Sequence, residues 1–309
     1  MQTFATALLT CLVCSIVPSP DANVAFNQFT VVSWNVDSGD ADPHVISLRL
    51  AQMRGVDLWG LTEVRDDRWA DLLKKAAQEN QSGPVVPLFS PTGGSGRSLI
   101  LYDAAQFELL QYFELGWEDQ SWHRPDAVLR PALIAQLRHR PTNQEFFFMV
   151  NRFLPQWAAL QAVKVNYWAA RQTIPVIAVG SYYFQYCLGP QAVQCDGQKG
   201  LKVMAYDGAF QWVKPENPIS TFDHEANTIE DFVFLANAVG RLYAQSTILV
   251  EPGDFPDDAS TSDHRPLRTT FTVQSAAPEM MLRHRIREQI QKIQCELNVL
   301  EALVHQLPD

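Results

Sequence analysis

The chain has 309 residues, of which 47% are hydrophobic, so it can bury a globular core and is not a disordered tail. Its 34 acidic side chains outnumber the 24 basic ones, which gives a formal net charge of −10. This balance argues against a protein held on nucleic acid by a basic face, because released counterions normally supply most of that affinity. Acidic phosphodiesterases that use divalent cations are still allowed, since the metal supplies the missing positive charge.

The amino-terminal end carries an apolar run at residues 4–17, about as long as the core of a signal peptide and too short to span a bilayer. No Lys or Arg precedes the run, so a buried strand or helix is the alternative. We therefore treat residues 1–25 as a candidate signal peptide and expect no transmembrane span. The protein is expected to be secreted or periplasmic if this segment is cleaved, and cytoplasmic otherwise.

Two cysteines in the middle of the chain, Cys187 and Cys195, are close enough in sequence to close a small loop. In an oxidising compartment they would form a disulfide, whereas in a reducing one they would be two buried thiols. The sequence leaves both alternatives open.

Between residues 28 and 274 the chain alternates β-like runs with short helical patterns. Runs rich in aliphatic, aromatic and β-branched residues predict strands at 29–34, 56–61, 98–102, 132–137, 146–150, 175–179, 229–235 and 268–273. Helical periodicity predicts helices at 44–53, 68–80 and 157–171. Many strands with few helices between them predict an α/β protein built as a four-layer α/β/β/α sandwich, two packed mixed sheets flanked by helices.

The carboxyl-terminal segment, residues 279–307, has a different pattern. Its apolar residues recur at alternating steps of four and three, at Ile286, Ile290, Ile293, Leu297, Leu300, Val304 and Leu307. This spacing predicts an amphipathic helix with a coiled-coil stripe, called here the heptad seam (residues 286–307). The seam either pairs with a second copy of the chain or packs back on the parent domain.

Polar side chains stand at the ends of several predicted strands, where an ordinary strand does not need them. Asn35 ends the first strand, Glu63 ends the second, Asp231 opens a late one, and a Ser-Asp-His-Arg-Pro sequence at 262–266 precedes the last. In this order and spacing they resemble the endonuclease/exonuclease/phosphatase superfamily of metal-dependent phosphoesterases. The Arg-Ser-Leu-Ile-Leu-Tyr-Asp sequence at 97–103 adds to the resemblance.

The resemblance implies a role for each of these residues. Phosphoester hydrolysis needs a hard cation such as Mg²⁺ or Mn²⁺, bound by carboxylate and amide oxygens, and a group that moves protons. Glu63 would be the principal metal carboxylate with Asn35 beside it, and Asp263 would ligate or orient near His264. His264 would act as acid/base or contact the phosphate, and Asp231 would orient a histidine or the phosphate. Taken singly, Asn35 and Asp231 also fit strand-end caps, and Glu63 a surface carboxylate.

At three positions the sequence departs from the family pattern. Family members carry Asn-His-Leu after a central strand, whereas this chain has Arg152 in place of the histidine. They also carry Gly-Asp-x-Asn after the next strand, whereas this chain has Ser181 and Tyr183 in place of the aspartate and asparagine. Arg152 keeps a positive charge that can bind a phosphate, but it is no base at neutral pH. Removing a single acid/base group typically costs about 10²- to 10⁴-fold in rate.

Three hypotheses follow. The first is a degenerate phosphoesterase with strongly reduced or lost activity, which retains at most a weak cation site at Asn35 and Glu63. The second is an active metal-dependent phosphodiesterase or phosphatase with rearranged chemistry that uses Arg152 and His264. The third is a non-catalytic interaction module that self-associates through residues 286–307. The substrate is not predicted, and the acidic balance disfavours long nucleic acids without excluding them.

Overall fold

The computed structural model describes most of the predicted domain: residues 27–37, 40–81, 83–115, 130–189, 198–223, 227–252, 254–255 and 260–274. The candidate signal peptide, Cys195 and the carboxyl-terminal segment lie outside the described residues. Cys187 is disulfide-bonded and is the only cysteine within them, so its partner lies outside them too. None of the helices in the described ranges is long and apolar enough to cross a membrane.

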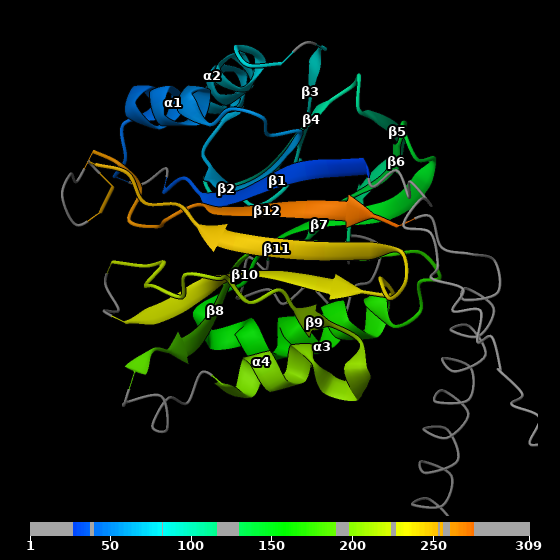
Figure 1. Ribbon diagram of the computed structural model, residues 1–309. Coiled ribbons are helices and arrows are strands. Elements are labelled where there is room, and N and C mark those ends of the chain that lie inside the picture. Colours follow the sequence, from blue (N-terminus) through cyan, green and yellow to red (C-terminus); the bar gives the residue numbers. More distant parts are fainter. Residues whose placement is uncertain are drawn as a thin grey trace, which may run out of the picture.

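The first sheet has six strands in the order β11-β12-β1-β2-β4-β3. Their bounds are β1 Asn27–Asn35, β2 Leu58–Val64, β3 Val85–Phe89, β4 Arg97–Asp103, β11 Leu242–Ile248 and β12 Leu267–Val273. Only the β1–β2 pair is parallel. Two helices, α1 (Pro43–Gln52) and α2 (Asp67–Gln78), cover the outer face of this sheet (Figure 1).

The second sheet also has six strands, in the order β5-β6-β7-β8-β10-β9. Their bounds are β5 Phe107–Glu114, β6 Leu133–His139, β7 Gln144–Arg152, β8 Val176–Cys187, β9 Gln211–Trp212 and β10 Thr228–Ala236. Here β7 and β8 are the parallel pair. Its outer face is covered by α3 (Ala158–Ala169) and α4 (Gln198–Met204), with short 3-10 helices at Pro155–Trp157 and Tyr206–Gly208 (Figure 1).

Aromatic side chains from both sheets fill the space between them. Phe29 of β1 stacks on Phe146 of β7 with ring centroids 5.3 Å apart, and on Phe271 of β12 at 5.2 Å. Such large buried rings contribute much of the apolar area that holds two sheets together. A second apolar cluster, which includes Trp59 and Leu73, lies between the first sheet and its two helices. The two six-stranded sheets, with two helices on each outer side, agree with the predicted α/β sandwich.

All eight predicted strands and the three predicted helices are observed, with ends shifted by a few residues. The sequence analysis missed β3, β5, β9, β11 and α4. Strands β5 and β11 present polar or exposed residues on one side, and Pro87 interrupts the pattern of β3. These segments form strands because of the neighbouring strands with which they pair, and their own sequences contain no continuous apolar run that would predict a strand. Strand β8 also continues past its apolar part to Cys187.

Gly180 fixes the approach of β7 to β8 beside the candidate site. It pairs with Asn151 of β7 and has a φ of 128°, which only glycine adopts easily. A Cβ atom at this position would lie 1.9 Å from the backbone oxygen of Asn151. The glycine thus keeps the following pair, Arg152 and Ser181, side by side across the two strands.

We predict that Gly180→Ala destabilises the fold by about 3 kcal/mol or more, because backbone strain and backbone overlap add. The matched control is Gly94→Ala, which also requires a positive φ (63°) but meets nothing within 4 Å. It should cost only about 1–2 kcal/mol, from strain alone. Urea unfolding followed by circular dichroism measures both values, and equal losses in the two variants would contradict this account of Gly180.

Candidate active site

The polar residues singled out from the sequence come together at one edge of the two packed sheets. Parallel neighbours end at the same edge, so β1 and β2 bring Asn35 and Glu63 together, and β7 and β8 bring Arg152 and Ser181 together. Strand β10 runs antiparallel to β8, so Asp231, near its start, lies opposite Ser181 at that same edge. The site is therefore built from both sheets.

Glu63 is the meeting point of the two sheets in the site. Its Oε1 accepts hydrogen bonds from Asn35 Nδ2 at 3.0 Å and from Arg152 Nε at 2.6 Å, and Arg152 Nη2 also forms an ion pair with it. Glu63 has a φ of 61° at an irregularity in the β2–β4 pairing, which turns the carboxylate out of the regular sheet. The side chains of Arg152 and Glu63 are only 11% and 17% exposed.

Tyr183 closes the other side of the guanidinium. Arg152 Nη2 donates to Tyr183 Oη at 3.3 Å, and the guanidinium carbon lies 5.8 Å from the centre of the tyrosine ring. Tyr183 has a φ of 53° and lies where the β8–β10 pairing shifts register between Ile229 and Asp231. Burial raises the pKa of Tyr183 to about 12, although the charge of Arg152 opposes the shift, so the phenol is protonated at neutral pH.

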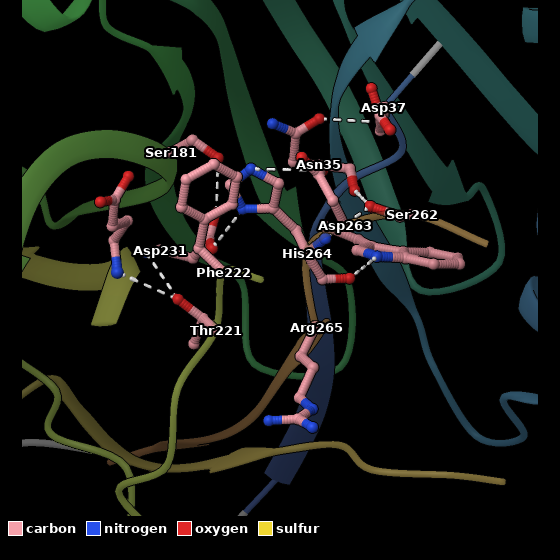
Figure 2. Close-up of polar contacts among 12 residues, drawn as sticks. Asn35, Asp37, Ser181, Thr221, Phe222, Asp231, Ser262, Asp263, His264 and Arg265 are labelled. Carbon is pink, nitrogen blue, oxygen red and sulfur yellow. Dashed lines mark hydrogen bonds and ion pairs between the residues drawn. The ribbon is translucent and has the colours of Figure 1, made fainter. Parts of the chain in front are cut away.

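Asp231 joins His264 and Ser181 in a second, fully buried cluster (Figure 2). His264 Nδ1 lies 2.7 Å from Asp231 Oδ2, and Ser181 Oγ donates to Asp231 Oδ1. On the other side of the imidazole, Nε2 lies 3.7 Å from Oδ1 of Asp263. The structure therefore brings all three predicted catalytic residues into one group, together with Ser181.

The sequence analysis missed the residues that hold this cluster in place. Thr221 Oγ1 accepts from the backbone N–H groups of Glu230 and Asp231, at 3.0 and 3.3 Å. The ring of Phe222 lies 4.6 Å from the imidazole of His264 (Figure 2). Thr221 and Phe222 lie in a segment without regular periodicity, and their backbone pairs with Thr228 and with the histidine loop, at Arg265 and His264. No local sequence signal points to them.

Ser262 and Trp34 attach the histidine loop to the first sheet. Ser262 Oγ donates to the backbone oxygen of Asn35 at 2.6 Å and accepts from the N–H of His264 at 3.0 Å. Trp34 Nε1 donates to the backbone oxygen of His264 at 2.9 Å. These bonds connect the two clusters, so the predicted site is one continuous hydrogen-bonded unit.

The charge state of His264 follows from its neighbours. Burial alone would lower the pKa of His264, but the charge of Asp231 and its hydrogen bond, with smaller contributions from Asp263 and Glu63, raise the pKa to about 9. His264 is therefore a cation at neutral pH, paired with Asp231. In this state the imidazole can donate a proton but cannot accept one.

The residues present do not fit a resident divalent cation at Glu63. The oxygen Oε1 of Glu63 is occupied by the guanidinium of Arg152. Asn35 uses Oδ1 to accept from the N–H of Asp37 at 3.0 Å, so its amide nitrogen faces Glu63, and an amide nitrogen is not a ligand for Mg²⁺. Among the described residues no group of three or more His, Cys, Asp or Glu side chains could hold a metal ion.

Comparisons with known proteins agree with this architecture. No protein-family model and no curated protein matches the chain. Among solved structures, an endonuclease/exonuclease/phosphatase family protein from Bacteroides thetaiotaomicron matches with a TM-score of 0.58 at 15% identity, over 81% of this chain and 96% of that chain. A mannosyl-6-phosphatase from B. thetaiotaomicron matches with a TM-score of 0.57 at 16% identity, over 79% and 99%.

A further match is D. rerio TDP2 complexed with single strand DNA product, with a TM-score of 0.56 at 17% identity, over 79% of this chain and 99% of that chain. The chain has the endonuclease/exonuclease/phosphatase fold. The matched part of this chain corresponds to nearly the whole length of each of these three solved structures. Identities this low establish the architecture, and the chemistry has to be argued from the residues themselves.

The raised pKa of His264 predicts how stability depends on pH. The unfolded histidine has a pKa of about 6.5, so its stabilising contribution is complete below pH 6.5 and is lost as the pH rises through about 9. We expect wild type to lose on the order of 3 kcal/mol more than His264→Gln between pH 6 and pH 10. Urea unfolding at both pH values measures this difference.

His139 supplies the control, because it titrates in the opposite direction. Burial lowers the pKa of His139 to about 4, so its contribution is complete above pH 6.5 and is lost as the pH falls through 4. His139→Gln should therefore change the acid limb of the stability profile and leave the alkaline limb unchanged. An alkaline limb that is the same in wild type and His264→Gln would show that Asp231 does not hold the histidine charged.

Proposed function

We propose that this protein is a phosphoesterase-fold protein in which metal-dependent hydrolysis is strongly reduced or lost, because the guanidinium of Arg152 replaces the divalent cation at Glu63. The observation that supports the proposal is the contact of Arg152 Nε and Nη2 with Glu63 Oε1. A charge-assisted pair of this kind is among the stronger hydrogen-bonded contacts in proteins. It satisfies the carboxylate with a cation that belongs to the chain itself.

A divalent cation would have to displace this pair before it could bind. Separating a guanidinium from a largely buried carboxylate costs on the order of 3 kcal/mol, since both charges lose their partner. If Arg152 stayed nearby, its positive charge would repel the incoming cation at short range. Arg152 therefore acts against metal binding through both the lost contact and the repulsion.

The two other altered positions support the same conclusion. Ser181 donates to Asp231 and carries no charge, so it cannot activate a water molecule as an aspartate does. Tyr183 fills the space beside Arg152 with a ring whose hydroxyl is protonated at neutral pH. Neither residue offers the base that an attacking water would need.

The first prediction of this proposal concerns metal binding and needs no substrate. Wild type should show no saturable binding of Mn²⁺ in the millimolar range. Arg152→Ala removes the competing guanidinium, so Glu63 and an Asn35 turned to present its amide oxygen can coordinate the metal. Mn²⁺ should therefore bind that variant weakly and raise its melting temperature. Electron paramagnetic resonance of free Mn²⁺ and thermal unfolding measure the two effects.

The matched control is the double variant Arg152→Ala, Glu63→Gln, which lacks both the guanidinium and the carboxylate. It should not bind Mn²⁺, and its melting temperature should not respond to the metal. The proposal would be overturned if wild type bound Mn²⁺ tightly and Glu63→Gln removed that binding, because the cation and the guanidinium would then share the site.

The second prediction concerns activity. The variant Arg152→His, Ser181→Asp, Tyr183→Asn restores the family residues and should hydrolyse phosphoester reporters in Mg²⁺ or Mn²⁺ at least about 10²-fold faster than wild type. The reporters should include a phosphomonoester and a phosphodiester, since a mannosyl-6-phosphatase and a DNA-bound protein share this fold. Adding Glu63→Ala to the restored variant should return the rate to background.

One observation favours a second candidate, an active phosphodiesterase or phosphatase with rearranged chemistry. His264 and Asp231 form an intact pair at 2.7 Å, and Asp263 lies within 3.7 Å of the other ring nitrogen. A charged imidazole in this arrangement can protonate a leaving oxygen. Turnover by wild type that His264→Ala abolishes would establish this candidate and remove the first.

A further inference from the structure

Helix α3 presents an apolar surface on its outer side. Leu160, Val163 and Tyr167 recur on one face and are 39%, 51% and 59% exposed. The opposite face, with Ala162 and Val165, is buried against the second sheet. A helix that is apolar on both faces is normally covered on both. The outer face of α3 therefore has the composition of an interface, and Figure 1 shows α3 on the outside of the second sheet.

This surface continues beyond the helix. Tyr206 is 66% exposed, and its backbone oxygen accepts from Asn166 Nδ2 of α3 at 3.3 Å. The guanidinium of Arg171 lies 4.3 Å from the centre of the Tyr167 ring at the carboxyl end of the helix. Together Leu160, Val163, Tyr167 and Tyr206 form what is called here the α3 surface, an apolar strip longer than one helical turn.

The last described residue lies next to the carboxyl end of α3. The N–H of Gln274 donates to the backbone oxygen of Arg241 at 2.8 Å. Arg241 Nη1 donates to the backbone oxygen of Thr173 at 2.7 Å, and Thr173 follows shortly after α3 ends at Ala169. The chain beyond Gln274 therefore starts at the end of the sandwich at which α3 also ends.

The sequence beyond that point contains an apolar stripe that has no partner within itself. Residues 275–285 can reach roughly 35 Å when extended, and the heptad seam at 286–307 follows them. As a helix the seam would be about 33 Å long, against about 18 Å for α3. Most of the stability of an amphipathic helix in a protein comes from packing of its apolar face, so the stripe of the seam is expected to be covered.

We propose that the heptad seam packs on the α3 surface of its own chain, antiparallel to α3. The segment enters at the carboxyl end of α3 and runs toward the amino end, which places the isoleucine and leucine stripe over Val163 and Tyr167. This pairing covers the α3 surface and about half the length of the seam, and it requires no second molecule. It is independent of whether the phosphoesterase site is active.

The test uses the full-length protein and follows amide hydrogen exchange in residues 286–307, together with molar mass by light scattering. Wild type should be a monomer in which these amides are protected. Val163→Glu places a charge on the α3 surface and should speed their exchange by about tenfold or more. The matched control is Leu48→Glu on α1, where the leucine is 66% exposed. This variant should leave the exchange of residues 286–307 unchanged.

Ile293→Glu places a charge in the heptad seam instead of on the α3 surface, and the substituted residue lies outside the described domain. It should produce the same loss of protection as Val163→Glu, and the double variant should lose no more than either single variant, because both break one contact. The proposal would be overturned if wild type had the mass of a dimer and Val163→Glu did not alter the protection of residues 286–307. That result would indicate pairing between the seams of two chains. Unprotected amides in wild type would overturn it outright.

Discussion

The ion pair between Glu63 and Arg152 is the contact around which the candidate site is arranged. It joins β2 of one sheet to β7 of the other, and both of its ends are held by neighbours, Asn35 at the carboxylate and Tyr183 at the guanidinium. A largely buried carboxylate needs a counter-charge, and this chain supplies that charge from a neighbouring strand. The arrangement removes the electrostatic reason for a divalent cation to bind.

The intact His264–Asp231 pair has a structural explanation that does not require catalysis. The backbone of His264 accepts from Trp34 and donates to Ser262, and Ser262 in turn donates to β1. Thr221 holds the start of β10 through two backbone N–H groups. Loss of either member of the pair would leave a buried polar group unpaired and loosen the loop that closes the sandwich. The pair therefore has a stabilising role whether or not the protein catalyses a reaction.

Apolar runs are local signals, and they predicted eight of the twelve strands of the described sheets. The meeting of Asn35, Glu63, Asp231 and His264 at one edge was implied by the resemblance to the endonuclease/exonuclease/phosphatase superfamily. The partner of Arg152 could not be predicted. Its charge indicates a phosphate ligand, yet its guanidinium contacts a carboxylate 89 positions away on the other sheet. Strands with one polar side, and residues such as Thr221 whose partners lie in other elements, were missed for the same reason: their environment is created by packing between elements.

The three departures from the family pattern are best understood as one set. Ser181 donates to Asp231, so an aspartate there would place two carboxylates in contact, which is tolerable only with a cation beside them. With Arg152 already paired to Glu63, a neutral hydroxyl at 181 avoids that repulsion without a metal ion. Tyr183 then accepts a hydrogen bond from the guanidinium and contributes a neutral group at neutral pH. The three side chains are therefore mutually compatible: Arg152 pairs with Glu63, Tyr183 accepts from Arg152, and Ser181 adds no second negative charge beside Asp231.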